Sequence, residues 1–396
     1  MRAVCWQGVN KLSVERVPDP ALINPHDAII KVAISTTCGS DLHLLGGYVP
    51  TMRAGDIIGH EFVGEVVEVG AEVKRLKRGD RVIAVSILGC GSCSFCEHGQ
   101  WSLCDNTNPN DELLRLAYGS ATAGILGYSH AFGGFAGSHA EYIRLPFAEH
   151  GAFRIPDGIS YEQALFLSDA VPTGYMGADL CNIHPGDIVA VWGAGGVGQM
   201  AAKSAFLLGA TRVVIIDRFP YRLKMAREKI GADVLNYEDV DVYEALMDIT
   251  RGRGPDACID AVGMEAHGAG LSYLYDKVKT AVRLETDRPQ VLREAIRCCR
   301  KGGTISIMGV YGGYVDKFPI GAAMNKGLTF RMGQQHGQRY VPILLDLVEA
   351  GHLDPSYLIT HRMALEEAPR GYEMFKNKED NCVRAAFYPA EERAVA

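Results

Sequence analysis

The sequence has no excess of positive charge and no long run of apolar residues. It contains 40 lysine and arginine residues against 47 aspartate and glutamate residues, a formal net charge of −7. A nucleic-acid partner usually requires a basic face, and a membrane-spanning helix requires about 20 consecutive apolar residues. The first residues, MRAVCWQGVNKLSVERVPDP, carry charges throughout and lack the apolar segment of a signal peptide. We therefore expect a cytoplasmic protein that binds neither nucleic acid nor membrane.

Internal repeats and low-complexity linkers are also missing, so the domains must be found from element patterns. A chain of 396 residues is long for one hydrophobic core and suits two domains. The first 150 residues or so are rich in short Val/Ile runs bounded by Gly, Asp or Pro, which predict a β-rich unit. These runs are AIIKVAIS (28–35), FVGEVVEVG (62–70) and DRVIAVSI (80–87). The segment 105–139 has little periodicity and is expected to be a long loop.

Strands and helices alternate after residue 160, which predicts an α/β unit with a parallel sheet. Expected strands include IVAVW (188–192), RVVIID (212–217) and TISIMGV (304–310), and an Ala-rich helix is expected at 197–209. The predicted division is a β-rich domain over 1–170, a doubly wound parallel-sheet domain over 171–315, and a return to the first domain over 316–396.

Four of the eleven cysteines follow a metal-ligand spacing, Cys90-x2-Cys93-x2-Cys96-x7-Cys104. Four thiolates around Zn²⁺ form a closed tetrahedral site with no position for substrate. An iron–sulfur cluster is the main rival, but no Pro follows the last cysteine and no second cluster motif is present. We expect a structural zinc that does no chemistry. The other cysteines are expected to be core residues, because free cysteine is often buried: Cys5, Cys181, Cys258, Cys298, Cys299 and Cys382.

A glycine-rich turn follows the strand at 188–192 and opens a helix. It contains Gly193-x-Gly195-x2-Gly198, with Gly196 and Val197 inside it, and Asp217 ends the next strand. This context predicts a dinucleotide site, with the pyrophosphate at the helix N-terminus and Asp217 on the ribose hydroxyls. The charge of Asp217 would repel a 2′-phosphate, which favours NAD over NADP. Arg218 and Arg222 leave some room for NADP, although Arg222 is expected near the adenine or ribose.

Cys38 and His60 stand at expected strand ends beside glycines, where rigid elements can hold a site. Each alone is more often a core residue than a ligand. The order CGSDLH, GHE-x2-G-x5-G-x2-V, GDRV, four-cysteine segment and GAGGVG resembles the zinc-dependent medium-chain alcohol dehydrogenase family over nearly the whole chain. That resemblance implies a GroES-like catalytic domain and a Rossmann domain, and makes Cys38 and His60 ligands of a catalytic zinc. Glu61 would lie behind this second zinc and ligate it transiently.

The third ligand implied by the resemblance differs from the usual one. Most members supply a cysteine, whereas the matching stretch FLSDAVPTGY offers Asp169. Carboxylate oxygen is an acceptable zinc ligand, and Asp at this place resembles the glutathione-independent formaldehyde dehydrogenase and formaldehyde dismutase branch. The same resemblance routes the substrate proton to Ser40, through the cofactor ribose, to His43 and solvent. The long connection at 264–290 also resembles that branch, in which it covers the cofactor; an ordinary surface excursion is an equal alternative.

The resemblance implies an enzyme that transfers hydride between a primary alcohol or hydrated aldehyde, formaldehyde favoured, and NAD. The alternatives are a general NAD(P)-dependent alcohol or polyol dehydrogenase and a dismutase with tightly held NAD. A zinc-lobe interaction or nucleic-acid-binding protein is disfavoured by the acidic balance and by the context of the GAGGVG turn. The expected cofactors are two Zn²⁺ per chain and NAD, and the family suggests a homotetramer or homodimer.

Overall fold

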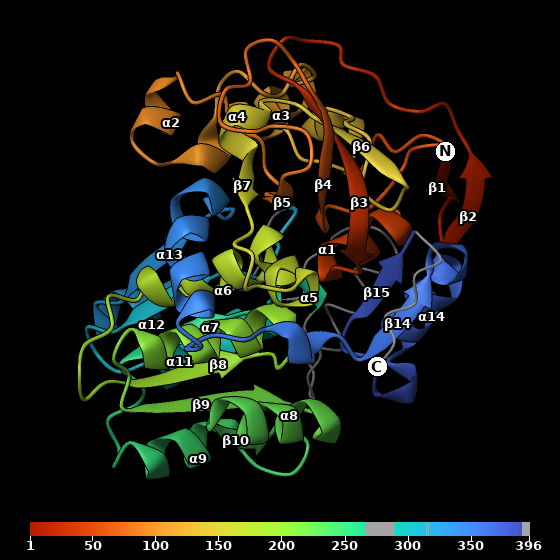
Figure 1. Ribbon diagram of the computed structural model, residues 1–396. Coiled ribbons are helices and arrows are strands. Elements are labelled where there is room, and N and C mark those ends of the chain that lie inside the picture. The colour runs from red at the N-terminus through yellow and green to blue at the C-terminus, as the bar shows by residue number, and fades with distance from the viewer. Residues whose placement is uncertain (266–288, 314, 316, 390–396) are drawn as a thin grey trace. The chain divides into compact units, whose positions relative to one another are not determined.

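The computed structural model describes residues 1–265, 289–313, 315 and 317–389 (Figure 1). It divides into two compact units. Unit 1 consists of Met1–Pro172 and Gln335–Ala396, and unit 2 of Thr173–Gln334. Most of the expected 264–290 excursion lies outside the described residues. Among the described helices, none combines the length and apolar character needed to cross a membrane.

Unit 1 is built on a mostly antiparallel seven-stranded sheet. Its order is β14-β15-β3-β4-β5-β7, and β6 pairs with β3 beside this path. A separate hairpin joins β1 (Arg2–Gly8) to β2 (Lys11–Arg16). The strands of the large sheet are β3 (Ala28–Thr36), β4 (Glu61–Val69), β5 (Arg81–Ala84), β6 (Tyr142–Leu145), β7 (Ala152–Arg154), β14 (His361–Ala364) and β15 (Ala385–Tyr388).

The burial of β3 accounts for its sequence, which does not alternate cleanly between apolar and polar residues. Eight of its nine residues avoid full exposure, and only Lys31 faces solvent. Ile30 and Val32 enter one apolar cluster with Phe62 of β4, while Ile29 and Ile34 are buried outside this cluster. Gly64 lies opposite Val32, and a Cβ there would come 2.2 Å from the Lys31 carbonyl oxygen. Most of the strand is therefore buried, and only Lys31 interrupts its apolar run.

The helices of unit 1 are short, and they connect the strands or cover them. They are α1 (Gly39–Leu45), α2 (Ser94–Glu97), α3 (Glu112–Tyr118), α4 (Ala148–Gly151), α5 (Tyr161–Leu165), α13 (Gly337–Glu349) and α14 (Ala368–Asn377), with 3₁₀ turns that include η1 (Trp101–Leu103), η2 (His130–Phe132) and η3 (Phe166–Ser168). The segment 105–139 contains only α3 and η2 as helices, in keeping with the expected loop. α6 (Ala170–Asp179) contains the point where the chain passes from unit 1 to unit 2.

Unit 2 is a parallel six-stranded sheet in the order β10-β9-β8-β11-β12-β13. The strands are β8 (Ile188–Trp192), β9 (Arg212–Asp217), β10 (Asp233–Asn236), β11 (Ala257–Asp260), β12 (Thr304–Ile307) and β13 (Thr329–Met332), and the helices are α7 (Gly196–Leu207), α8 (Pro220–Ile230), α9 (Val242–Ile249), α11 (Gln290–Cys298) and α12 (Ile320–Lys326). The order reverses after β10, so right-handed crossovers place α7 and α8 on one face and the later helices on the other. The Rossmann-type sheet predicted from the sequence is present.

The return to unit 1 comes later than the sequence suggested. The expected position was residue 316, whereas the structure keeps the chain in unit 2 up to Gln334. The reason is β13, which pairs in parallel with β12 from Thr304↔Thr329 to Ile307↔Met332. This strand extends the parallel sheet by one position, so the residues leading to it belong with that sheet.

Candidate active site

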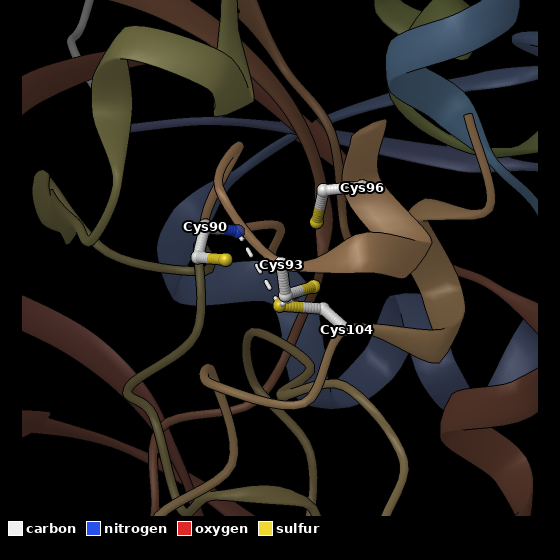
Figure 2. A group of neighbouring side chains, drawn as sticks. All are labelled: Cys90, Cys93, Cys96 and Cys104. Carbon is white, nitrogen blue, oxygen red and sulfur yellow. Dashed lines mark hydrogen bonds between the residues drawn. The ribbon is translucent and has the colours of Figure 1, made fainter. Parts of the chain in front are cut away.

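The four-cysteine segment forms a lobe whose sulfur atoms gather around one point (Figure 2). The four Sγ atoms all lie within 4.8 Å of one another, and none is in a disulfide. They belong to Cys90, Cys93, Cys96 and Cys104. Cys93 and Cys104 have their sulfurs 3.9 Å apart. Zn–S bonds of about 2.3 Å in a tetrahedron require an S···S separation of about 3.8 Å. The donor set and its spacing therefore fit a closed zinc site.

Backbone and side-chain N–H groups point at these sulfurs. Cys104 Sγ accepts from the amides of Cys90 and Asn106, both at 3.4 Å, and Cys90 Sγ accepts from Asn106 Nδ2 at 3.3 Å. Burial would raise the pKa of Cys90, but the hydrogen bonds from Ser92 and Asn106 lower it to about 6. Burial raises the pKa of Cys96 and Cys104. A cation is therefore what allows all four sulfurs to be thiolates together.

A second cluster of metal-ligating atoms lies at the ends of β3 and β4 in unit 1. It joins Cys38, His60, Glu61 and Asp169, whose donor atoms all lie within 4.8 Å of one another. Cys38 is the N-cap of α1, His60 directly precedes β4, and Asp169 follows η3. The structure thus brings together the three residues that the family resemblance implied as ligands, with Glu61 among them. One sulfur, one nitrogen and one oxygen suit a zinc with an open position.

Glu61 is fully buried and faces a buried cation. The Arg384 Nη1 atom lies 3.0 Å from Glu61 Oε1, and the same guanidinium donates to the Thr37 carbonyl oxygen. Burial raises the pKa of Glu61 to about 7, even though the charge of Arg384 acts in the opposite direction. Arg384 directly precedes β15, far along the chain, and no local pattern around Glu61 identifies it.

Each of the other ligands is also held by a partner outside the cluster. The His60 Nδ1 atom lies 3.0 Å from Asp41 Oδ1, and Ser86 Oγ donates to Asp169 Oδ2. Ser86 in turn accepts from Gln335 Nε2 at 3.1 Å. Burial alone would raise the pKa of Asp41, but the neighbouring His60 lowers it to about 2. Such second contacts fix the orientation of metal ligands.

Sequence reasoning did not assign these supporting residues. Asp41 is the third residue of α1, and it accepts from the Cys38 amide at 2.9 Å. The spacing Cys38-x2-Asp41 is a helix-capping pattern and was a usable signal. For Ser86 and Gln335, which are 249 positions apart, the sequence offers no comparable signal.

Ser40 lies against two atoms of the cluster. Its Oγ is 3.2 Å from Cys38 Sγ and 3.2 Å from His60 Nε2. A hydroxyl in this place can reach an oxygen bound at the open position. His43 lies on the next turn of α1 and is buried, with 4% of its surface exposed.

The glycine turn of unit 2 has the geometry that close phosphate approach requires. Gly193 has φ of +95°, and Gly195 is the N-cap of α7, with Gly196 and Val197 as its first residues. A Cβ on Gly198 would lie 1.8 Å from the Gly193 carbonyl oxygen, so no other residue fits. The first-turn amides of α7 are therefore available to an anion.

Asp217 ends β9 beside this turn. Its Oδ2 accepts from the Ala194 amide at 2.6 Å, and its Oδ1 accepts from the amides of Arg218 at 2.6 Å and Phe219 at 3.1 Å. Arg222 Nη1 lies 3.8 Å from the Cβ position of Gly195, so its guanidinium is also next to the turn. Arg218 pairs with Glu238 at 3.6 Å. The predicted cofactor residues thus occupy one end of the parallel sheet.

Comparisons with known proteins agree with this geometry. The profile of the alcohol dehydrogenase GroES-like domain matches residues 24–157, and that of zinc-binding dehydrogenases matches residues 196–282. The chain is 39% identical over 392 residues to the uncharacterized zinc-type alcohol dehydrogenase-like protein AdhB of Bacillus subtilis, covering 98% of this chain and 100% of that protein. It is 30% identical over 400 residues to the glutathione-independent formaldehyde dehydrogenase of Pseudomonas aeruginosa, covering 94% of each.

A solved structure of an alcohol dehydrogenase has a similar fold over nearly the whole chain. The alcohol dehydrogenase TADH from Thermus sp. ATN1 superposes with a TM-score of 0.82 at 34% sequence identity, over 98% of this chain and 99% of that one. These relatives cover both units of the chain, so the similarity extends to the β-rich unit and the parallel-sheet unit alike.

Proposed function

Because the chain belongs to the zinc-type alcohol dehydrogenase family, we propose that it transfers hydride between a primary alcohol or hydrated aldehyde and NAD, with formaldehyde as the favoured substrate. The observation that carries the proposal is the Cys38–His60–Asp169 cluster, in which three different donor atoms meet beside the Ser40 hydroxyl. A zinc ion held there would supply Lewis acidity, which lowers the pKa of a hydroxyl group.

Protein side chains would then carry the proton of the substrate hydroxyl away from the site. Ser40 Oγ would form a hydrogen bond with the substrate hydroxyl and take its proton, and His43 on the next turn of α1 would form the outer end of the route. An imidazole can both accept and release a proton, which suits this task. Glu61, held by Arg384, stands ready as an additional oxygen ligand when the other ligands rearrange.

NAD is the proposed hydride acceptor. The N-terminus of α7 would bind the pyrophosphate, and Asp217 would accept the ribose hydroxyls, since a carboxylate oxygen can accept more than one hydrogen bond. Replacing Asp217 by Gly should raise the NADP to NAD ratio of kcat/KM by roughly 100-fold, the effect of removing a charge repulsion of about 3 kcal/mol. An unchanged ratio would show that Asp217 does not select the cofactor.

Two observations favour formaldehyde over larger alcohols. Asp169 stands where most members of the family supply cysteine, and one relative over 94% of the chain is a glutathione-independent formaldehyde dehydrogenase. A general alcohol dehydrogenase is the second candidate, favoured by the similarity to the Thermus enzyme. A carboxylate ligand donates less electron density than a thiolate, so we expect a more electrophilic zinc.

The decisive assay offers the purified protein formaldehyde and a panel of primary alcohols, each with and without added NAD. Formaldehyde oxidation that depends on added NAD supports the proposal. Formaldehyde turnover without added NAD indicates dismutation by a tightly held cofactor. Good turnover of alcohols with none of formaldehyde favours the second candidate. Metal analysis should give two zinc ions per chain, and one ion per chain would contradict the two-site arrangement.

A further inference from the structure

A chain of buried polar groups extends from His60 through Asp41. Asp41 Oδ1 contacts His60 Nδ1 at 3.0 Å, and Asp41 Oδ2 is 2.7 Å from the Tyr372 hydroxyl. The Tyr372 oxygen lies 2.7 Å from His139 Nε2, and His139 Nδ1 lies 2.8 Å from Ser35 Oγ. Asp41, Tyr372, His139 and Ser35 each expose 1% or less of their surface. No described role of the zinc ligands or of the cofactor turn accounts for this chain.

The chemistry of the groups decides where the hydrogen atoms lie. An ionised carboxylate only accepts hydrogen bonds, so the Tyr372 hydroxyl donates to Asp41 and its oxygen accepts from His139 Nε2–H. Burial lowers the pKa of His139 to about 4, so its ring carries one proton at neutral pH. His139 Nδ1 then accepts from the Ser35 hydroxyl. At the other end, His60 Nδ1 lies 3.0 Å from Asp41 Oδ1. A proton on this nitrogen faces the carboxylate, and in that tautomer the lone pair is on Nε2, where a metal ion would bind.

Close packing also fixes the position of His139 in the chain. A Cβ on Gly59 would come 2.5 Å from ring atoms of His139, and Gly59 has φ of +94°. The residue before His60 is therefore a glycine that makes room for the His139 ring. The ring also lies edge-on to Phe387, with centroids 5.2 Å apart. These contacts come from β3, α14, β15 and the segment before β6, which are distant in sequence.

We propose that Tyr372 and His139 are positioning residues, which act through Asp41 to set the tautomer and orientation of His60 at the zinc site. This inference rests on the zinc site of the proposed function. An apolar pair in the same volume would leave Asp41 Oδ2 with one donor fewer in a buried place, which costs free energy. The chain matches each donor with an acceptor from Ser35 to Asp41 Oδ2, and Asp41 Oδ1 lies 3.0 Å from His60 Nδ1.

The first test is Tyr372→Phe, with Tyr388→Phe as the matched control. Both variants lose a hydroxyl that bonds to a carboxylate, since Tyr388 donates to Glu162 Oε1 at 2.5 Å. Zinc transfer to a chromogenic chelator follows the two sites as separate phases. Tyr372→Phe should release zinc from the Cys38–His60–Asp169 site 10- to 100-fold faster, with the four-cysteine phase unchanged. Tyr388→Phe should release both at the wild-type rates.

The visible spectrum of the cobalt-substituted protein gives a readout of ligand geometry besides activity. We expect a changed band for Tyr372→Phe and the wild-type band for Tyr388→Phe. Wild-type zinc release together with a wild-type spectrum in Tyr372→Phe would overturn the inference.

A second pair of variants separates hydrogen bonding from packing. His139→Gln keeps an N–H group that can donate toward Tyr372, whereas His139→Leu keeps only the volume. His139→Gln should release zinc at a rate closer to wild type than His139→Leu does. Equal rates in the two variants would contradict a role for the His139 hydrogen bond.

The inference and the proposed function can fail separately. A wild-type protein without dehydrogenase activity would remove the proposed function, while faster zinc release in Tyr372→Phe would still support the chain. An active wild-type enzyme whose Tyr372→Phe variant keeps its zinc as tightly would remove the inference alone.

Discussion

The two cysteine-containing sites of unit 1 differ in how they are assembled. The lobe takes all its ligands from Cys90 to Cys104, and its supporting hydrogen bonds come from Ser92, Asn106 and the Cys90 amide. The other cluster takes one candidate ligand each from the ends of β3, β4 and η3. His60, Asp169 and Glu61 each contact a supporting side chain from elsewhere in the unit. A site that binds metal for stability can be local, whereas one that must stay open needs support from the whole fold.

The largest effect on zinc content and activity is expected at Cys38. Cys38→Ala removes the sulfur ligand of the Cys38–His60–Glu61–Asp169 cluster. The zinc should be lost from this site and kcat/KM should fall by about a thousandfold, since metal-ion catalysis contributes several kcal/mol. Metal analysis should then show one zinc per chain. The matched control is Cys382→Ala, another buried cysteine that lies outside both clusters. Its activity and zinc content should stay near wild type; equal losses in both variants would contradict the assignment of Cys38.

A smaller effect is expected at Ser86, which supports a ligand without being one. Ser86→Ala removes the donor to Asp169 Oδ2 and leaves the Gln335 amide without this acceptor. Zinc affinity at this site should fall roughly tenfold, with a similar fall in kcat/KM under metal-limiting conditions. Ser306→Ala, which removes a buried hydroxyl from β12 in unit 2, is the control. If Ser86→Ala binds zinc as tightly as the control, Asp169 does not need this hydrogen bond.

The smallest effect on turnover is expected in the lobe. Cys90→Ser removes one of four thiolates, so the structural zinc should be lost and thermal unfolding should begin roughly 10 °C lower, because structural zinc contributes several kcal/mol. At low temperature kcat should remain within about threefold of wild type, since this metal has no open position for substrate. Calorimetry and initial rates at 10 °C measure the two quantities. A loss of turnover as large as in Cys38→Ala would show that the lobe takes part in the chemistry.

Local patterns were sufficient for much of the fold. The strand at 188–192 and the one at 212–217 have the predicted bounds, because each is a short Val/Ile run ended by a turn. Gly231 ends α8 in the left-handed conformation, as a glycine after a helical run indicates. The six cysteines expected to lie in the core are all buried. The boundary near residue 334 was not predictable, because β13 is assigned to unit 2 only by pairing with β12.

The sequence by itself determined the four-cysteine lobe and the glycine turn, because their residues are neighbours and their spacing is set by local backbone geometry. Cys38, His60 and Asp169 were implied as one site only through a family resemblance. Tertiary structure alone decided which side chains contact these residues from outside the cluster. Asp41, Tyr372 and His139 follow His60, Ser86 and Gln335 follow Asp169, and Arg384 pairs with Glu61. Such partners are chosen by burial, where every polar group must find a match, and the sheet that buries them brings together residues as far apart as 331 positions.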